Sequence, residues 1–219
     1  MQKQFPLNLT LPEQELIRQN GLHLVFLKDH TVFSAGDDPR YSYLIDKGRV
    51  KIYRLNMDGE YITVSIRHQG EIFGLAEVLC NNPRQCFAET LETTSLYAVD
   101  RENLNRILSE HPLLGIKIAQ VLACRLRQAE TVIYDLVSYN VPARLARLLL
   151  TLSRQCGRPL KDSIKLDIVL THREIASMIG TTRQSVSQTL QEFKESNILE
   201  YKNKEFVIKD IDKLYQMAK

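Results

Sequence analysis

The sequence predicts an α+β chain: an N-terminal β jelly roll, a long central helix and a C-terminal winged helix-turn-helix. Three observations indicate this order. Short β-type segments fill residues 22–99, one long helical pattern follows, and the last third holds two helices around a glycine turn. We therefore expect three parts, at residues 1–110, 111–140 and 141–219.

Composition sets outer limits on function. The 219 residues are 44% hydrophobic and 25% charged, which is ordinary for a globular protein. A net charge of +3 does not by itself predict nucleic-acid binding, so any basic surface must be local. We see no signal peptide, lipidation motif or membrane-spanning run, and so expect a cytoplasmic protein with no membrane partner. The four cysteines lack metal-site spacing, so we predict reduced thiols and no metal.

The first part begins with a helix. Thr10 and Glu13 have the spacing of a capping box, with Pro12 in the first turn, which predicts a helix to about Asn20. Short β-type segments follow, separated by turn signals such as Gly36–Pro39, and many strands at this spacing predict an antiparallel jelly roll. The segments are Leu22–Phe26, Thr31–Phe33, Tyr41–Ile45, Val50–Tyr53, Tyr61–Val64, Phe87–Ala88 and Ser95–Val99.

The central part is helical. Asp100 is the predicted N-cap of a short helix, and Pro112 begins a long one that ends at a candidate hinge, Asn140–Pro142. Small and apolar residues recur along the long helix at spacings of four and three, the heptad pattern of a two-helix coiled coil. We call this row the seam and expect it to form a homodimer. Its members are Gly115, Ala119, Leu122, Leu126, Ala129, Ile133 and Leu136.

An alternative is that the seam packs on the chain's own β-domain. A second apolar row on the same helix is available for that contact, which favours use of both faces. This second row comprises Leu114, Ile118, Val121 and Val132.

The last part opens with a helix from Ala143 to about Cys156 and a strand at Lys165–Leu170. Thr171 and Glu174 then form a second capping box, Gly180 permits a turn with positive φ, and Thr182 can cap the next helix. The expected inward residues are Ile175, Ala176 and Ile179 on the first helix, with Val186, Leu190 and Phe193 on the second.

Polar residues at the start of the second helix point to a partner. Arg183, Gln184, Ser187 and Gln188 are left facing outward. Arginine pairs with guanine and glutamine with adenine in the major groove, so we predict double-stranded DNA as the partner and these residues as base readers. Strand, basic turn and strand at residues 199–208 predict a wing whose Lys202 and Lys204 meet phosphate. The alternative is an ordinary helical hairpin with a solvated polar face.

With these motifs in place, the chain resembles the cyclic-AMP receptor protein and fumarate-nitrate regulator (CRP/FNR) family of bacterial transcription factors. Leu170–Leu199 is the most specific piece, supported by Tyr43–Ile52, Asp58-Gly59, and Gly70–Gly74 followed by Glu77. The resemblance implies a cyclic-nucleotide-binding-like jelly roll, a homodimer on a two-fold symmetric operator, and RNA polymerase as a further partner. It also implies an effector that repositions the DNA-binding halves.

The resemblance also assigns DNA contacts. It implies base-edge contacts at Arg183, Gln184 and Gln188. Many relatives carry Glu and Arg at the last two of these positions, so the operator should differ from the best-known sites. The implied phosphate contacts are Thr171, His172, Arg173 and Thr182.

The implied effector pocket departs from the family pattern. Members that bind cyclic AMP have Gly-Glu and Arg-Ser pairs where this chain has Gly74-Leu75 and Arg84-Gln85, or Gln85-Cys86 with a one-residue shift. Glu130 adds negative charge where the base would dock, so we predict that cyclic AMP is not the effector. An iron–sulfur centre is unexpected because no cysteine precedes Cys80, and lone histidines seldom mark a haem ligand. A small organic ligand is the expectation. The pocket positions are Gly74, Leu75, Arg84, Gln85, Arg125, Ala129 and Glu130.

Two other functions compete with this one. A cupin-like metalloenzyme would need converging histidines, but His23, His30 and His68 lack the usual H-x-H spacing. A sensor module without DNA binding is disfavoured by Arg183 and the lysine-rich wing. We predict no catalytic residue. The effector, the operator, the sign of regulation and the redox role of Cys80 and Cys86 stay open, although two structural thiols are the simpler interpretation.

Overall fold

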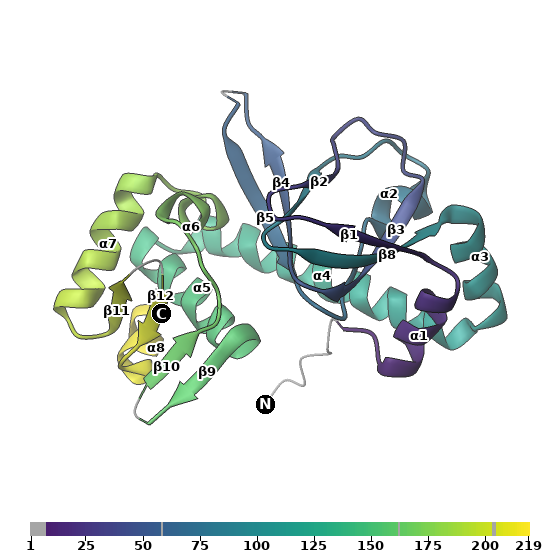
Figure 1. Cartoon of the computed structure of the whole chain (residues 1–219). Helices are drawn as coiled ribbons and strands as arrows, with labels where there is room; N and C mark the ends of the chain where they lie inside the picture. Colours follow the sequence, from purple (N-terminus) through teal and green to yellow (C-terminus); the bar gives the residue numbers. More distant parts are fainter. Residues whose placement is uncertain (1–7, 58, 162, 203–204) are drawn as a thin grey trace. The chain divides into compact units, whose positions relative to one another are not determined.

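The computed structural model describes residues 8–57, 59–161, 163–202 and 205–219, without the side chain of Lys202. The chain divides into two compact units, Met1–Gln128 and Ala129–Lys219 (Figure 1). The division falls inside the long helix α4, Pro112–Ser138. The three-part division at residues 110 and 140 stays a prediction.

Two four-stranded antiparallel sheets form the first unit, with orders β1-β8-β3-β6 and β2-β7-β4-β5 (Figure 1). This confirms the predicted jelly roll, and adds the short strand β6. The bounds are β1 Leu22–Phe26, β2 Thr31–Phe33, β3 Tyr41–Lys47, β4 Val50–Leu55, β5 Tyr61–Arg67, β6 Ile72–Phe73, β7 Phe87–Thr90 and β8 Thr94–Asp100.

Successive side chains of a strand point to opposite faces, and strand β3 is buried on both of its faces. Tyr43 and Ile45 point into the core between the sheets, where the Tyr43 ring stacks on Phe73 at 5.1 Å. Leu44 points to the other face, into a second core closed by helices α1 Leu11–Gln19, α2 Leu75–Cys80, α3 Arg101–Glu110 and the first half of α4.

The predicted helix caps of this unit are confirmed. The Thr10 amide donates to the Glu13 carboxylate at 2.6 Å, and the Asp100 carboxylate accepts from the Asn103 amide at 2.8 Å. Each cap satisfies an amide that the first turn of a helix leaves without a backbone partner.

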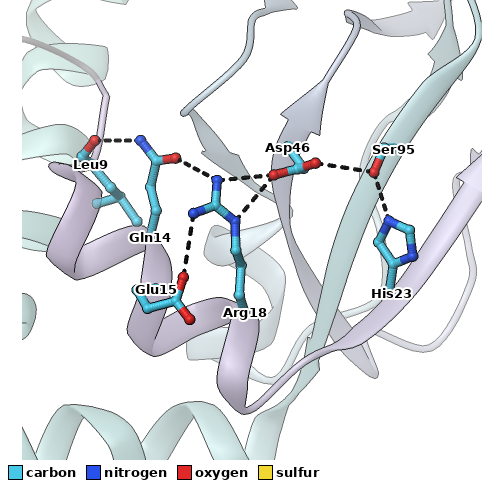
Figure 2. Close-up of polar contacts among 7 residues, drawn as sticks. All are labelled: Leu9, Gln14, Glu15, Arg18, His23, Asp46 and Ser95. Carbon is cyan, nitrogen blue, oxygen red and sulfur yellow. Dashed lines mark hydrogen bonds and ion pairs between the residues drawn. The ribbon is translucent and has the colours of Figure 1, made fainter.

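A polar chain ties α1 to the sheet (Figure 2). Arg18 donates to the Asp46 carboxylate at 2.9 Å, the Ser95 hydroxyl donates to the same carboxylate at 3.4 Å, and His23 Nε2 lies 2.8 Å from the Ser95 oxygen. A serine nucleophile needs a histidine between itself and the carboxylate. Here the serine lies in the middle, so this Ser–His–Asp group connects structural elements and has no catalytic order.

Helix α4 packs one face on the first unit. Leu114, Ile118 and Val121 are at most 3% exposed, as predicted for the second apolar row. Val132 is 47% exposed and belongs to the second unit, so its contact with the β-domain stays a prediction.

The second unit holds the last turns of α4, the helices α5 Val141–Cys156, α6 His172–Met178, α7 Arg183–Glu195 and α8 Ile211–Met217, and the sheet β11-β12-β10-β9. Its strands are β9 Gly157–Leu160, β10 Ser163–Leu166, β11 Leu199–Lys202 and β12 Glu205–Ile208. Helix α8 and strand β9 were not predicted.

The strand predicted at Lys165–Leu170 ends too late, because the observed strand β10 is Ser163–Leu166. Strand β10 stops at Leu166 because its neighbours β9 and β12 pair with it no further. Ile168 and Leu170 are buried at 3% and 1% exposure, although they lie outside any strand. Their apolar alternation reflects core packing of an extended loop.

The end of α4 is fastened to the second unit. Asp135 accepts from Arg147 of α5 at 2.8 Å, and the Arg147 guanidinium lies 4.5 Å from the centre of the Tyr139 ring. Asn140 caps α5 by accepting from the Ala143 amide at 3.1 Å. The predicted hinge therefore contains the N-cap of α5, and the ion pair between Arg147 and Asp135 holds α5 to the end of α4.

Within the described ranges, no single helix has the length and hydropathy needed to cross a membrane; α3 and α4 meet those requirements only as a pair bent by 114°.

Candidate DNA-binding face and effector region

The two helices α6 and α7 form as the capping pattern predicts. The Thr171 amide donates to the Glu174 carboxylate at 2.8 Å, and the Thr171 hydroxyl accepts from the Glu174 amide at 3.2 Å. Thr182 caps α7 by accepting from the Ser185 amide at 3.1 Å. Gly180 in the turn has φ +61°, the left-handed conformation that favours glycine.

Burial decides which residues of α7 face outward. The predicted inward residues of both helices are all at most 5% exposed: Ile175, Ala176, Ile179, Val186, Leu190 and Phe193. Arg183, Gln184 and Gln188 are exposed on the opposite side, and the Gln188 amide donates to Glu192 at 3.2 Å. The three residues thus share an accessible helical edge.

Ser187, the fourth predicted base reader, is in a different environment. It is partly buried, and its hydroxyl donates to the Arg183 carbonyl at 3.0 Å. His172 Nδ1 lies 2.7 Å from the same hydroxyl oxygen. Burial lowers the pKa of His172, and the nearby positive charge of Arg183 lowers it further. Sequence spacing gave no signal for this contact, which joins residues on different helices.

The predicted phosphate contacts are only partly described. Arg173 and Thr182 are exposed. Strands β11 and β12 form the predicted wing hairpin, in which Tyr201 pairs with Phe206 and their rings lie 4.5 Å apart. The Lys202 side chain and the whole of Lys204 lie outside the described residues.

The helix-turn-helix turn is supported from behind. The Leu136 Cδ2 atom lies 2.5 Å from where a Cβ on Gly180 would be, and Arg144 donates to the Gly180 carbonyl at 3.3 Å. Leu136, predicted as a seam residue, therefore also packs on this turn. The heptad pattern could not indicate a second role.

In the first unit, Arg84 is buried at 3% exposure; its two terminal nitrogens bind internal acceptors, while Nε has no partner among the described residues. It donates to the carbonyls of Gly74, at 2.8 Å, and of Tyr41, and it pairs with Glu77 at 3.4 Å. Its guanidinium lies 4.2 Å from the centre of the Phe33 ring. An incoming anion would have to compete with the Glu77 carboxylate for this arginine.

Arg125 holds the same chain segment from α4. It donates to the Ile72 carbonyl and shares the buried Glu71 carboxylate with Arg67, at 3.5 and 3.4 Å. Burial lowers the pKa of Arg125 to about 10, and the positive charge of Arg67 contributes. Two guanidinium groups around one carboxylate leave this region with excess positive charge.

The remaining pocket positions have other surroundings. Leu75 is 1% exposed and lies in the helix-side core. Gln85 is exposed and donates to the Pro83 carbonyl at 3.3 Å. Ala129 and Glu130 are exposed and belong to the second unit. Gly74, Arg84 and Arg125 are thus the predicted residues that the first unit gathers around Ile72–Gly74.

The seam residues differ in their surroundings. Leu126 and Ile133 are 62% and 63% exposed, and a Cβ on Gly115 would meet nothing within 4 Å. Leu122 is partly buried against the helix-side core. Much of the predicted seam therefore lies open to a partner.

Across the described part of the chain, no three His, Cys, Asp or Glu side chains are grouped as metal ligands. All four cysteines are free, and burial raises the pKa of the Cys86 thiol.

Two domain families match this chain: the cyclic nucleotide-binding domain over residues 23–111 and the Crp-like helix-turn-helix domain over residues 143–217. Together with the fold, they define a DNA-binding transcription regulator with an effector-binding domain. The Global nitrogen regulator of Synechocystis sp. is 31% identical over 185 residues, covering 84% of this chain and 82% of that protein. The chain belongs to the CRP/FNR family of transcription regulators.

Further similarities agree with that assignment. The Cyclic AMP receptor protein of Thermus thermophilus is 32% identical over 169 residues, covering 77% of this chain and 74% of that protein. A solved structure of a CooA mutant from Carboxydothermus hydrogenoformans has a TM-score of 0.80 at 28% identity, covering 93% of this chain and 90% of that chain.

Proposed function

We propose that this protein is a homodimeric regulator that binds a two-fold symmetric operator and responds to a small organic effector other than cyclic AMP. The observation that carries the proposal is the exposed edge of α7. Arg183, Gln184 and Gln188 are exposed to solvent there, on a helix that Thr182 caps. A recognition helix presents its first turns to base edges in this way. Because the partner is chromosomal DNA, we propose that the protein acts in the cytoplasm.

The homodimer is supported by the exposed part of the seam. Leu126 and Ile133 leave large apolar side chains in solvent on one long helix, at a heptad spacing. A second copy of α4 would cover them. Two copies would also present two recognition helices, which a two-fold symmetric operator requires.

Cyclic AMP is disfavoured by two local features. Leu75 offers a buried methyl-bearing side chain where a carboxylate would hold the ribose, and Arg84 is already paired with Glu77. The relatives do not agree on a signal: one is named a global nitrogen regulator, another a cyclic AMP receptor protein and a third an anaerobic regulatory protein. We infer a different small organic ligand near Gly74, Arg84 and Arg125, no enzymatic activity, and RNA polymerase as a protein partner.

The DNA-reading role is testable with a selected duplex. The protein is used to enrich its preferred sequence from a random duplex pool, and the dissociation constant is then measured for wild type and Arg183→Ala. We expect a loss of about 1–3 kcal/mol per half-site and relaxed preference at one base pair. The matched control is Arg106→Ala, an exposed arginine of the first unit, which should leave affinity unchanged. Equal losses on selected and random duplexes for Arg183→Ala would contradict base reading.

A further inference from the structure

His172 lies at the junction of three elements of the DNA-binding unit. It is the first residue of α6, its Nδ1 atom is 2.7 Å from the Ser187 hydroxyl oxygen of α7, and its ring is 4.9 Å from the Tyr201 ring of β11. Tyr201 in turn packs on Phe206 of β12. One imidazole therefore contacts the recognition helix and the wing together.

The hydrogen bonds favour one tautomer of this imidazole. Ser187 has one hydroxyl proton, which it donates to the Arg183 carbonyl at 3.0 Å. With the hydroxyl proton on the Arg183 carbonyl, the Ser187 oxygen is the acceptor for His172, and Nδ1 carries the ring proton. Nε2 is buried and has no partner among the described residues. A second proton there would create a buried donor without an acceptor.

Nearby charges also disfavour a second proton. Arg183 of α7 faces the ring, and Tyr201 of β11 covers it without adding a carboxylate. On α6 itself, Arg173 and Glu174 follow directly, but the Glu174 carboxylate is bound to the Thr171 amide and hydroxyl, both at 2.8 Å. The neutral imidazole is thus the form that fits this site.

We propose that His172 is a positioning residue for DNA recognition and not a phosphate contact: it holds Ser187 against the Arg183 carbonyl, so that Arg183, Gln184 and Gln188 read the bases and Ser187 does not. This inference rests on the proposed DNA-binding function. It revises both the phosphate contact that family resemblance implies for His172 and the base-reading role predicted for Ser187.

The two roles for His172 differ in the sign of their pH dependence. A histidine that contacts phosphate binds DNA more tightly when it is protonated, because the imidazolium is positive. In the positioning role Nδ1 can donate to Ser187 with or without a second proton, but a proton on the buried Nε2 would lack an acceptor, so protonation should disfavour this arrangement and weaken specific binding. Because the pKa of His172 is lowered from the ordinary 6.5, the loss should develop as pH falls through that lowered pKa.

The experiment uses the duplex that wild type selects from a random pool at pH 7.5. Dissociation constants are measured at pH 7.5 and 5.5 at constant ionic strength, for wild type, His172→Asn, His172→Leu and Ser187→Ala. We expect the affinity of wild type to fall between pH 7.5 and pH 5.5, opposite to the trend for a phosphate contact, because a protomer protonated at His172 must release that proton to bind. His172→Asn keeps a side-chain N–H donor that does not titrate, so it should match wild type at pH 7.5 and lose less at pH 5.5.

The remaining variants test the contact itself. His172→Leu and Ser187→Ala should each weaken specific binding about threefold or more at pH 7.5, and the double variant should be no weaker than either, because both remove one interaction. Thermal unfolding of each variant separates this loss from misfolding. Tighter binding at pH 5.5 that depends on His172, an unchanged pH profile in His172→Asn, or additive losses in the double variant would overturn the proposal.

A measurement without DNA separates this inference from the proposed function. The ¹⁵N shifts of the His172 ring in the free protein should show a neutral ring protonated on Nδ1 at pH 7.5, and Ser187→Ala should change its titration. A ring protonated on Nε2 would overturn the inference. If no duplex is enriched from the pool, the proposed function fails, and the ring shifts still decide how His172 is bound.

Discussion

At the scale of single residues, Gly180 bears two constraints at once. Its φ of +61° is strained for other residues, and Leu136 Cδ2 occupies the place of a side chain at 2.5 Å. The carbonyl of Gly180 also accepts from Arg144. The turn between α6 and α7 therefore depends on the absence of a Cβ as well as on backbone freedom.

Replacing Gly180 with alanine should destabilise the DNA-binding unit by about 1–3 kcal/mol, because the left-handed conformation and the displaced leucine both cost free energy. Thermal or urea unfolding measures the change. Gly59→Ala is the control, since Gly59 also has positive φ, at +75°, but a Cβ there meets nothing within 4 Å. Equal losses for the two variants would show that Leu136 contributes nothing.

At the scale of elements, α4 is one continuous helix with different surroundings along its length. Its first half buries Leu114, Ile118 and Val121 in the first unit, while Leu126 and Ile133 stay open. Its last turns are held by Arg147 and by the turn at Gly180. The same periodicity of 3.5 residues thus serves a core contact, an exposed row and a packing contact with the DNA-binding unit.

Introducing a charge on the exposed row should separate the dimer. Leu126→Glu or Ile133→Glu would place two like charges in an apolar interface, so we expect monomers at micromolar concentration and loss of specific DNA binding. Light scattering measures the mass. Leu113→Glu is the control: Leu113 is also on α4 and 79% exposed, but it lies off the seam and should leave the dimer intact. A monomeric wild type would contradict the assignment.

The elements also show what a sequence can predict. The caps at Thr10, Asp100, Thr171 and Thr182 are local interactions between residues three apart, so the residue types at that spacing are enough to predict them. The end of β10 depends instead on how far β9 and β12 run beside it, which no local pattern contains. The apolar alternation at Leu166–Leu170 looked like a strand for that reason.

The candidate sites follow the same division. The exposure of Arg183, Gln184 and Gln188 was predictable because helical spacing alone places them opposite the buried stripe. The contact between His172 and Ser187 joins two helices, and the pairing of Arg84 with Glu77 depends on how a short helix meets a loop. Such contacts follow from tertiary packing and leave no local signature.

At the scale of the whole molecule, the identity of the effector decides what the regulator reports. We expect no micromolar binding of cyclic AMP by calorimetry and no gain in operator affinity when it is added. The reason is that Arg84 is paired with Glu77 and Leu75 is buried in the core. The Thermus thermophilus Cyclic AMP receptor protein serves as the positive control for the titration. Micromolar binding with tighter operator affinity would contradict the prediction.

The packing of the end of α4 on the second unit determines where the chain can be divided to make fragments and chimeras. A fragment cut at Val141 would discard Asp135, Leu136 and Tyr139, and with them a partner of Arg147 and the side chain beneath Gly180. A fragment that begins at Ala129 retains all of them. Chimeras that exchange sensors between relatives should therefore be joined in the middle of the long helix, where a graft keeps each half's own packing.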